Sequence, residues 1–217
     1  MVEDKLYVDV VDTIENVGHK TIKGFDYIIK KYDFDYMFRT NSSSYIVQDI
    51  LLDYLKDKPT TKFLNASGNS FPSGSGYIMS RDVVETVLGI QNLWNHSYLD
   101  DVALGTLIDE NTDIKLTSAD RIDYEDYLDI PEYIDPKVYH FRCKTFKGDR
   151  NHDVEILKKL HSIYYDSSNN RKNIIEKYIY TSSNDIASRN KKINSTILFV
   201  VLLLLIIIII SYFLLCK

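Results

Sequence analysis

A serine between two glycines and a pair of adjacent carboxylates are the residues whose types and spacing best suit chemistry. Gly74-Ser75-Gly76 lets the backbone bend tightly and approach a ligand, since glycine carries no side chain. Asp100-Asp101 opens a short apolar segment further along, and a carboxylate beside bare backbone can take a proton from a bound hydroxyl. The same residues also suit a tight turn and a helix N-terminus, where the helix dipole favours carboxylates. Both interpretations fit the sequence.

Hydrophobic patterning predicts the elements around these motifs. Residues 77–79 predict a short buried strand, and residues 83–91 predict the helix that follows it, with Ser80 or Asp82 as its cap. The acidic pair then begins a small apolar helix. A loop, a strand, a helix and an acidic pair in this order would bring the carboxylates beside the glycine backbone.

The N-terminal part predicts an alternation of strands and helices. Residues 6–12 form a β-branched run that predicts a buried strand, an amphipathic helix follows, and residues 36–39 predict a second strand. A polar loop over residues 41–44 then leads to a helix predicted over residues 45–55. This order is typical of an α/β layer with parallel strands, in which ligands bind at the carboxyl ends of the strands. Asp12 and the polar loop fall at such ends.

The C-terminal half of the domain carries weaker patterns. We expect an edge strand over residues 113–116, a surface loop over residues 118–135 and a strand over residues 137–144. Residues 152–164 predict an amphipathic helix. The expected core side of that helix comprises Val154, Ile156, Leu157, Leu160 and Ile163.

The end of the chain predicts a membrane span. Residues 197–216 are 20 residues without a charge, rich in leucine and isoleucine. A helix of this length covers roughly 30 Å, the hydrocarbon thickness of a bilayer. Arg189, Lys191 and Lys192 precede it, and Lys217 alone follows. The positive-inside tendency therefore predicts a single-pass, C-terminally anchored membrane protein with its main domain in the cytosol.

Composition argues against several other classes of protein. The net charge is −5 and the basic residues are scattered, which argues against nucleic acid as a partner. Cys143 and Cys216 are the two cysteines, so no disulfide framework can form within the domain. The first residues lack the basic start and apolar core of a signal peptide.

Several motifs, taken together, carry a resemblance to a known family. Residues 12–21 partly match a segment Asp-x-Tyr-x-Asn-Leu-Thr-x-Lys-Thr, and residues 71–80 are similar to Tyr-Pro-x-Tyr-x-Ser-Gly-x-Gly-Tyr-x-x-Ser. Residues 100–105 are similar to Glu-Asp-Val-x-x-Gly, and residues 140–144 to a late His-x-Arg-x-Lys strand. Over about residues 6–160 the chain thus resembles the β-1,3-galactosyltransferase and fringe-type glycosyltransferases.

The resemblance implies a fold and a reaction. The fold is α/β, a GT-A-like mixed sheet with flanking helices, here followed by one C-terminal transmembrane helix. The reaction is the transfer of a hexose from a nucleotide sugar to a hydroxyl of a glycan acceptor, with inversion. Asp101 would be the base and Asp100 its neighbour, while Gly74, Ser75 and Gly76 would bind substrate through the backbone.

The resemblance also implies a divalent cation, Mn²⁺ or Mg²⁺, and here the chain departs from the family. Family members have Lys-Thr-Asp-Asp-Asp where this chain has Arg-Thr-Asn-Ser-Ser over residues 39–43. The metal position would therefore be held by Asn41, Ser43 and His140. The amide and the hydroxyl supply neutral oxygens in place of the carboxylates that hard cations prefer.

Fixed cations are the expected replacement for the lost metal charge. Arg39, Arg142 and Lys144 are the candidates to bind the substrate in this way. Asp12 is a further substrate-binding candidate; a solvated loop aspartate is the alternative interpretation of this residue.

The sequence thus predicts three parts: a glycosyltransferase-like domain over residues 1–165, a polar helical or linker segment over residues 166–194 and a transmembrane anchor over residues 195–217. The alternative function is a catalytically inactive sugar- or nucleotide-binding or scaffold protein of the membrane that retains the fold. A third interpretation is an incomplete enzyme that lacks the first strands of the family. The neutral triplet favours the alternative function, and the acidic pair favours the enzyme.

Overall fold

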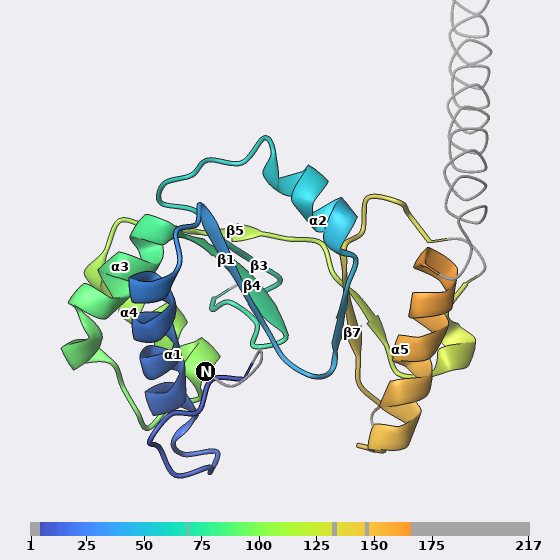
Figure 1. Ribbon diagram of the computed structural model, residues 1–217, viewed down its shortest axis with the longest axis horizontal. Helices are drawn as coiled ribbons and strands as arrows, with labels where there is room; N and C mark the ends of the chain where they lie inside the picture. Colours follow the sequence, from blue (N-terminus) through green and yellow to red (C-terminus); the bar gives the residue numbers. More distant parts are fainter. Residues whose placement is uncertain (1–4, 69, 132–133, 146–147, 166–217) are drawn as a thin grey trace, which may run out of the picture. The chain divides into compact units, whose positions relative to one another are not determined.

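The computed structural model describes residues 5–68, 70–131, 134–145 and 148–165, which form an α/β arrangement of mixed sheets with flanking helices (Figure 1). The helices are α1 (Val17–Lys31), α2 (Gln48–Leu55), α3 (Arg81–Gly89), α4 (Asp100–Asn111) and α5 (Arg150–Tyr164), with the 3-10 helices η1 (Gln91–Leu93) and η2 (Tyr127–Asp129). The strands are β1 (Tyr36–Thr40), β2 (Ser44–Ile46), β3 (Leu64–Ala66), β4 (Gly76–Ser80), β5 (Leu116–Ser118), β6 (Ile122–Tyr124) and β7 (His140–Cys143).

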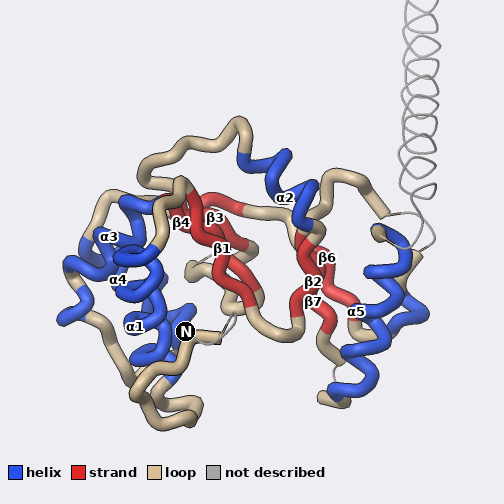
Figure 2. The backbone as a smooth tube through the Cα atoms, viewed as in Figure 1, coloured by secondary structure: helices blue, strands red, loops and turns tan. Residues whose placement is uncertain are grey.

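The first sheet has the order β1-β4-β3-β5. β4 pairs antiparallel with β1 and with β3, and β3 pairs parallel with β5. Helices α1, α3 and α4 pack together beside this sheet, as the tube in Figure 2 shows. Phe25 of α1, Tyr77 and Met79 of β4 and Leu104 of α4 belong to one buried apolar cluster, which joins these helices to the sheet.

The second sheet has the order β2-β7-β6, with β2 antiparallel and β6 parallel to β7. α5 packs on one of its faces through Ile156 and Leu160, which are fully buried against Val47 and Phe141. A third apolar cluster holds α2 against Ile78 of β4 and against Tyr139, the residue just before β7. Both sheets therefore have their own apolar cover.

The prediction of a strand over residues 6–12 is wrong. These residues form no strand, and only Lys5 just before them makes a single bridge; the side chains of Tyr7 and Val11 are 75% and 71% exposed. The backbone N–H of Val10 instead donates to the carbonyl of Val8, and that of Thr13 to the carbonyl of Val11. Local turns thus take up the hydrogen bonds that a ladder would need.

The prediction of parallel neighbours is wrong for the central strands. β1 and β4 follow the predicted positions of residues 36–39 and 77–79, yet they run antiparallel, and three of the five pairings between the described strands are antiparallel. β1 lies at the edge of its sheet and pairs with β4 alone among the described strands. The sheets are mixed, as the resemblance implies.

Smaller differences concern the second half. The region predicted as a surface loop, residues 118–135, contains β6 and contributes Tyr124, Ile130 and Ile134 to the core. The helix predicted over residues 45–55 begins only at Gln48, because Ser44–Ile46 pairs with β7. Helix α5 confirms the prediction for residues 152–164, although Val154 is 42% exposed and not part of its core side.

No helix among the described residues is long and apolar enough to cross a membrane. The predicted anchor over residues 195–217 and the predicted linker over residues 166–194 lie outside the described residues.

Candidate functional site

Residues 73–76, here called the glycine loop, turn tightly just before and into β4. The N–H of Gly76 donates to the carbonyl of Ser73 at 3.0 Å, and the N–H of Ser73 donates to the carbonyl of Ser67 at 3.0 Å. A Cβ at Gly76 would lie 2.7 Å from Cε1 of His140 and 2.8 Å from Cζ of Phe38. Glycine is needed here because two aromatic side chains from other strands press against its backbone.

Asp101 holds the glycine loop from the first turn of α4. Its Oδ2 accepts the N–H of Gly74 at 2.8 Å, and its Oδ1 accepts the N–H of Val102 at 2.9 Å. A Cβ at Gly74 would lie 2.8 Å from that Oδ2, so only glycine allows this approach. Each carboxylate oxygen accepts one hydrogen bond and retains capacity for another. The half-buried carboxylate can therefore also meet a hydroxyl.

Asp100, unlike Asp101, is buried and engaged in an ion pair. Its buried carboxylate forms an ion pair with Arg39 of β1, and the hydroxyl of Thr21 in α1 donates to the same oxygen at 3.0 Å. Arg39 also donates to the carbonyl of Gly74. The guanidinium of Arg39 thus compensates a buried carboxylate, and this engagement weakens the prediction that it acts as a cation for substrate.

The spacing of the acidic pair and Gly105 has a structural reason. Gly105 lies one helical turn after Asp101, on the same side of α4. A Cβ at Gly105 would lie 2.5 Å from Cβ and 2.8 Å from Cα of Phe71, which is 40% exposed. Asp101 and Gly105 therefore dock the chain around the glycine loop onto α4.

The neutral triplet over residues 41–43 does not converge with His140. Oδ1 of Asn41 accepts the N–H of Ser43 at 3.0 Å and the hydroxyl of Ser44 at 3.2 Å, which stabilises the turn between β1 and β2. The hydroxyl of Ser43 accepts from Arg150 of α5 at 2.6 Å. Ser43 is thus turned toward α5.

His140 instead lies on the opposite face of the second sheet. The pairs Ser44↔Arg142 and Ile46↔His140 share one face, because side chains alternate along strands. Nε2 of His140 lies 3.4 Å from the hydroxyl of Ser44. The predicted ligands Asn41, Ser43 and His140 are therefore not brought together, and the described residues contain no group of three or more His, Cys, Asp or Glu side chains that could hold a metal.

His140 is 1% exposed, and this burial changes its protonation. Burial, the largest cause, and the nearby Arg121 together lower the pKa of His140 to about 4, although Asp123 opposes the shift. The imidazole is therefore neutral at neutral pH.

A cluster that the sequence analysis missed lies beside the glycine loop. Nη1 of Arg121 contacts the hydroxyls of Ser67, Ser73 and Ser75 at 2.6, 2.8 and 2.6 Å. Nη2 of Arg121 donates to Asp123 at 3.0 Å, and Nη1 of Arg142 lies 3.3 Å from the same carboxylate. We call these residues the arginine–serine cluster. The alternation Arg121-x-Asp123 just before and within a strand was the available signal, because it predicts one shared face.

Two further predicted residues, Asp12 and Lys144, make no side-chain contact with the glycine loop or the arginine–serine cluster among the described residues. The side chain of Asp12 is 96% exposed and forms an ion pair with Lys20, which fits the interpretation as a solvated loop aspartate. Lys144 is exposed, and its backbone N–H donates to the carbonyl of Tyr124 at 3.2 Å. Arg142 is the predicted cation that lies in the cluster.

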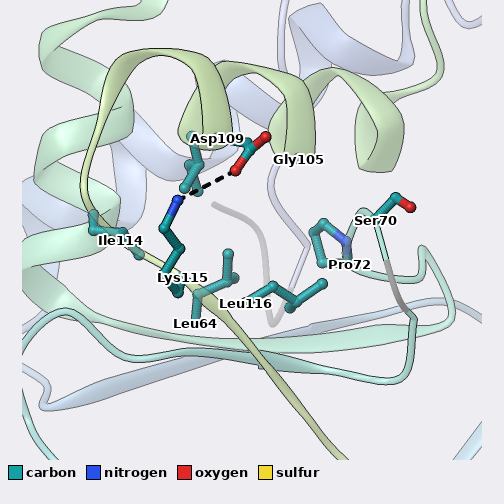
Figure 3. Close-up of a pocket in the computed structure, with 9 residues that line it drawn as sticks. Leu64, Ser70, Pro72, Gly105, Asp109, Ile114, Lys115 and Leu116 are labelled. Atoms are coloured by element: carbon teal, nitrogen blue, oxygen red, sulfur yellow. Dashed lines mark hydrogen bonds and ion pairs between the residues drawn. The ribbon is translucent and has the colours of Figure 1, made fainter.

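Two cavities adjoin these elements. One of about 490 Å³ lies between α1 and β1 and reaches Arg39 and Thr40. The other, of about 360 Å³, lies between α4 and β5, where Lys115 lies 3.4 Å from Asp109 (Figure 3). Its lining residues are Leu64, Ser70, Pro72, Gly105, Ile108, Asp109, Ile114, Lys115 and Leu116. Among the predicted site residues, Arg39 alone lines either of these two cavities.

No protein-family model matches the chain, and no curated protein matches it in sequence. The family resemblance therefore stays a prediction.

Replacing Gly76 with alanine tests the close approach of β4 to His140 and Phe38. We expect Gly76→Ala to lower the free energy of unfolding by about 1–3 kcal/mol, because a Cβ would overlap both rings. The matched control is Gly24→Ala in the interior of α1, where a Cβ would meet no atom within 4 Å. Alanine should raise stability there by about 0.5–1 kcal/mol. Equal effects in urea unfolding would contradict the packing described here.

The buried His140 should make stability depend on pH. Its ordinary pKa is 6.5 and its folded pKa is about 4, so the unfolded chain binds more protons between these values. Stability should therefore fall as the pH drops from about 6.5 to about 4, with a contribution on the order of 3 kcal/mol. Urea unfolding of the parent and of His140→Gln across this range measures the contribution. The variant should show a shallower slope, and an unchanged slope would refute the assignment.

Proposed function

We propose that the chain is a glycosyltransferase-like protein with a GT-A-like domain. In this proposal it transfers a hexose from a nucleotide sugar to a hydroxyl of a glycan acceptor with inversion. The observation that carries the proposal is the convergence of separate motifs on the glycine loop. Gly74 is bound by Asp101 and Arg39. The carbonyl of Ser75 accepts hydrogen bonds from Thr40 and Ser44, and the ring of His140 packs against Gly76. These partners come from α4, β1, β2 and β7.

Asp101 is the proposed base. The acceptor oxygen would attack the anomeric carbon, the bond from that carbon to the diphosphate would break, and Asp101 would take the hydroxyl proton. The nucleoside diphosphate would leave with the bonding electrons. The N–H groups of Gly74 and Val102 hold both oxygens of Asp101 in place, and a fixed carboxylate is what general base catalysis requires.

The second candidate is a sugar- or nucleotide-binding or scaffold protein without turnover. A specific observation favours it: the acidic motif already has a complete structural role, because Asp101 and Gly105 dock the glycine loop onto α4. The neutral triplet also supplies no carboxylate for a divalent cation.

Asp101→Asn separates the two candidates. Asparagine keeps an oxygen for the N–H of Gly74 but cannot act as a base, so we expect the fold to persist and kcat to fall about 100-fold or more. The full-length chain in mild detergent would be titrated with a panel of nucleotide sugars, with and without Mn²⁺, and assayed for transfer. Asp109→Asn is the matched control, an exposed carboxylate further along the same helix. Binding without transfer, unchanged in Asp101→Asn, would favour the second candidate; no binding would refute the transferase.

We also propose that residues 195–217 anchor the protein in a membrane with the domain in the cytosol. The uncharged run and the basic residues before it support this proposal. The full-length chain should stay in the membrane pellet after an alkaline carbonate wash, and a chain that ends at residue 194 should be released. Release of the full-length chain would contradict the anchor.

A further inference from the structure

We propose that the arginine–serine cluster binds a diphosphate through guanidinium and hydroxyl groups, without a metal ion. The inference rests on the proposed function, since the diphosphate would be that of the nucleotide-sugar donor. It assigns a ligand to residues that the motifs of the sequence did not single out together.

The cluster carries one uncompensated positive charge. Arg121 and Arg142 share the single carboxylate of Asp123, and the neighbouring His140 is neutral at neutral pH. Arg121 binds Asp123 through two nitrogens, whereas Arg142 reaches it through Nη1 at 3.3 Å. That contact is the one hydrogen bond of the Arg142 guanidinium within the described part of the chain. The side chain of Arg142 is 38% exposed, so its other N–H groups can reach a ligand.

The serine hydroxyls add donors beside this charge. The hydroxyls of Ser67, Ser73 and Ser75 share the two N–H groups of one Arg121 nitrogen, and a hydroxyl that accepts in this way still has its own proton to donate. One of these protons is used in the 3.0 Å hydrogen bond between the hydroxyls of Ser73 and Ser75. The Arg121 side chain is only 15% exposed, which strengthens its polarisation of the hydroxyls.

A phosphate group fits this set of donors better than a divalent cation does. Both oxygens of Asp123 already accept from guanidinium groups, and an excess positive charge repels a cation. Arginine forks and hydroxyls are, in contrast, common partners of phosphate oxygens. Because Ser75 follows Gly74, which Asp101 holds, a diphosphate bound here would lie next to the proposed base along the glycine loop.

Binding of inorganic pyrophosphate and of UDP to the full-length chain tests the inference. Isothermal titration in EDTA should detect both ligands. Arg142→Gln should weaken binding about 10-fold, and Arg142→Lys should weaken it less, because lysine keeps the charge and loses the fork. Asp123→Asn should tighten binding several-fold, since it removes the compensating charge while an oxygen remains for Arg121. Lys158→Gln, an exposed cation of α5 outside the cluster, should leave the affinity unchanged.

The opposite signs of the two substitutions separate ligand binding from a merely structural role. Weaker binding in Asp123→Asn, equal effects of Arg142→Gln and Lys158→Gln, or loss of binding in EDTA would each overturn the inference. Binding with the expected signs but no sugar transfer would support the cluster and refute the transferase. Transfer that requires Mn²⁺, with binding abolished by EDTA, would support the transferase and refute the cluster.

Discussion

The contact between the Asp101 carboxylate and the N–H of Gly74 is the constraint on which the arrangement of the site depends. It fixes the glycine loop on the first turn of α4, and Gly105, one turn later, makes room for Phe71. Neither approach tolerates a side chain at the glycine. The conformation of the loop is therefore set by side chains that reach its bare backbone at the glycines.

Once the loop is fixed, it becomes the junction between the two sheets. The carbonyl of Ser75 accepts hydrogen bonds from Thr40 of β1 and Ser44 of β2, and the hydroxyl of Ser75 accepts from Arg121. Gly76 lets His140 of β7 approach the backbone of β4. A short stretch of chain thus joins residues from both halves of the described domain.

Charge compensation explains how the site differs from the resembled family. The buried carboxylate of Asp100 is paired with Arg39, and the triplet of residues 41–43 is occupied with the β1–β2 turn and with Arg150 on the far face of the second sheet. On the near face, Arg121 and Arg142 outnumber the one carboxylate between them. The excess positive charge at this junction of the two sheets is therefore carried by arginine side chains of the protein.

The sequence alone determined much of the local structure: the positions of β1, β4, α3, α4 and α5 follow from hydrophobic periodicity, and Gly74, Gly76 and Asp101 were recognised from residue type and spacing. It misplaced the strand at residues 6–12, where the backbone N–H groups of Val10 and Thr13 donate to carbonyls two residues earlier and not to a neighbouring strand. Only the tertiary structure decided that Ser43 and His140 face opposite ways and that Arg121 meets three serines. Those outcomes depend on strand register and sheet order, and a shift of one residue in pairing would reverse which side chains share a face.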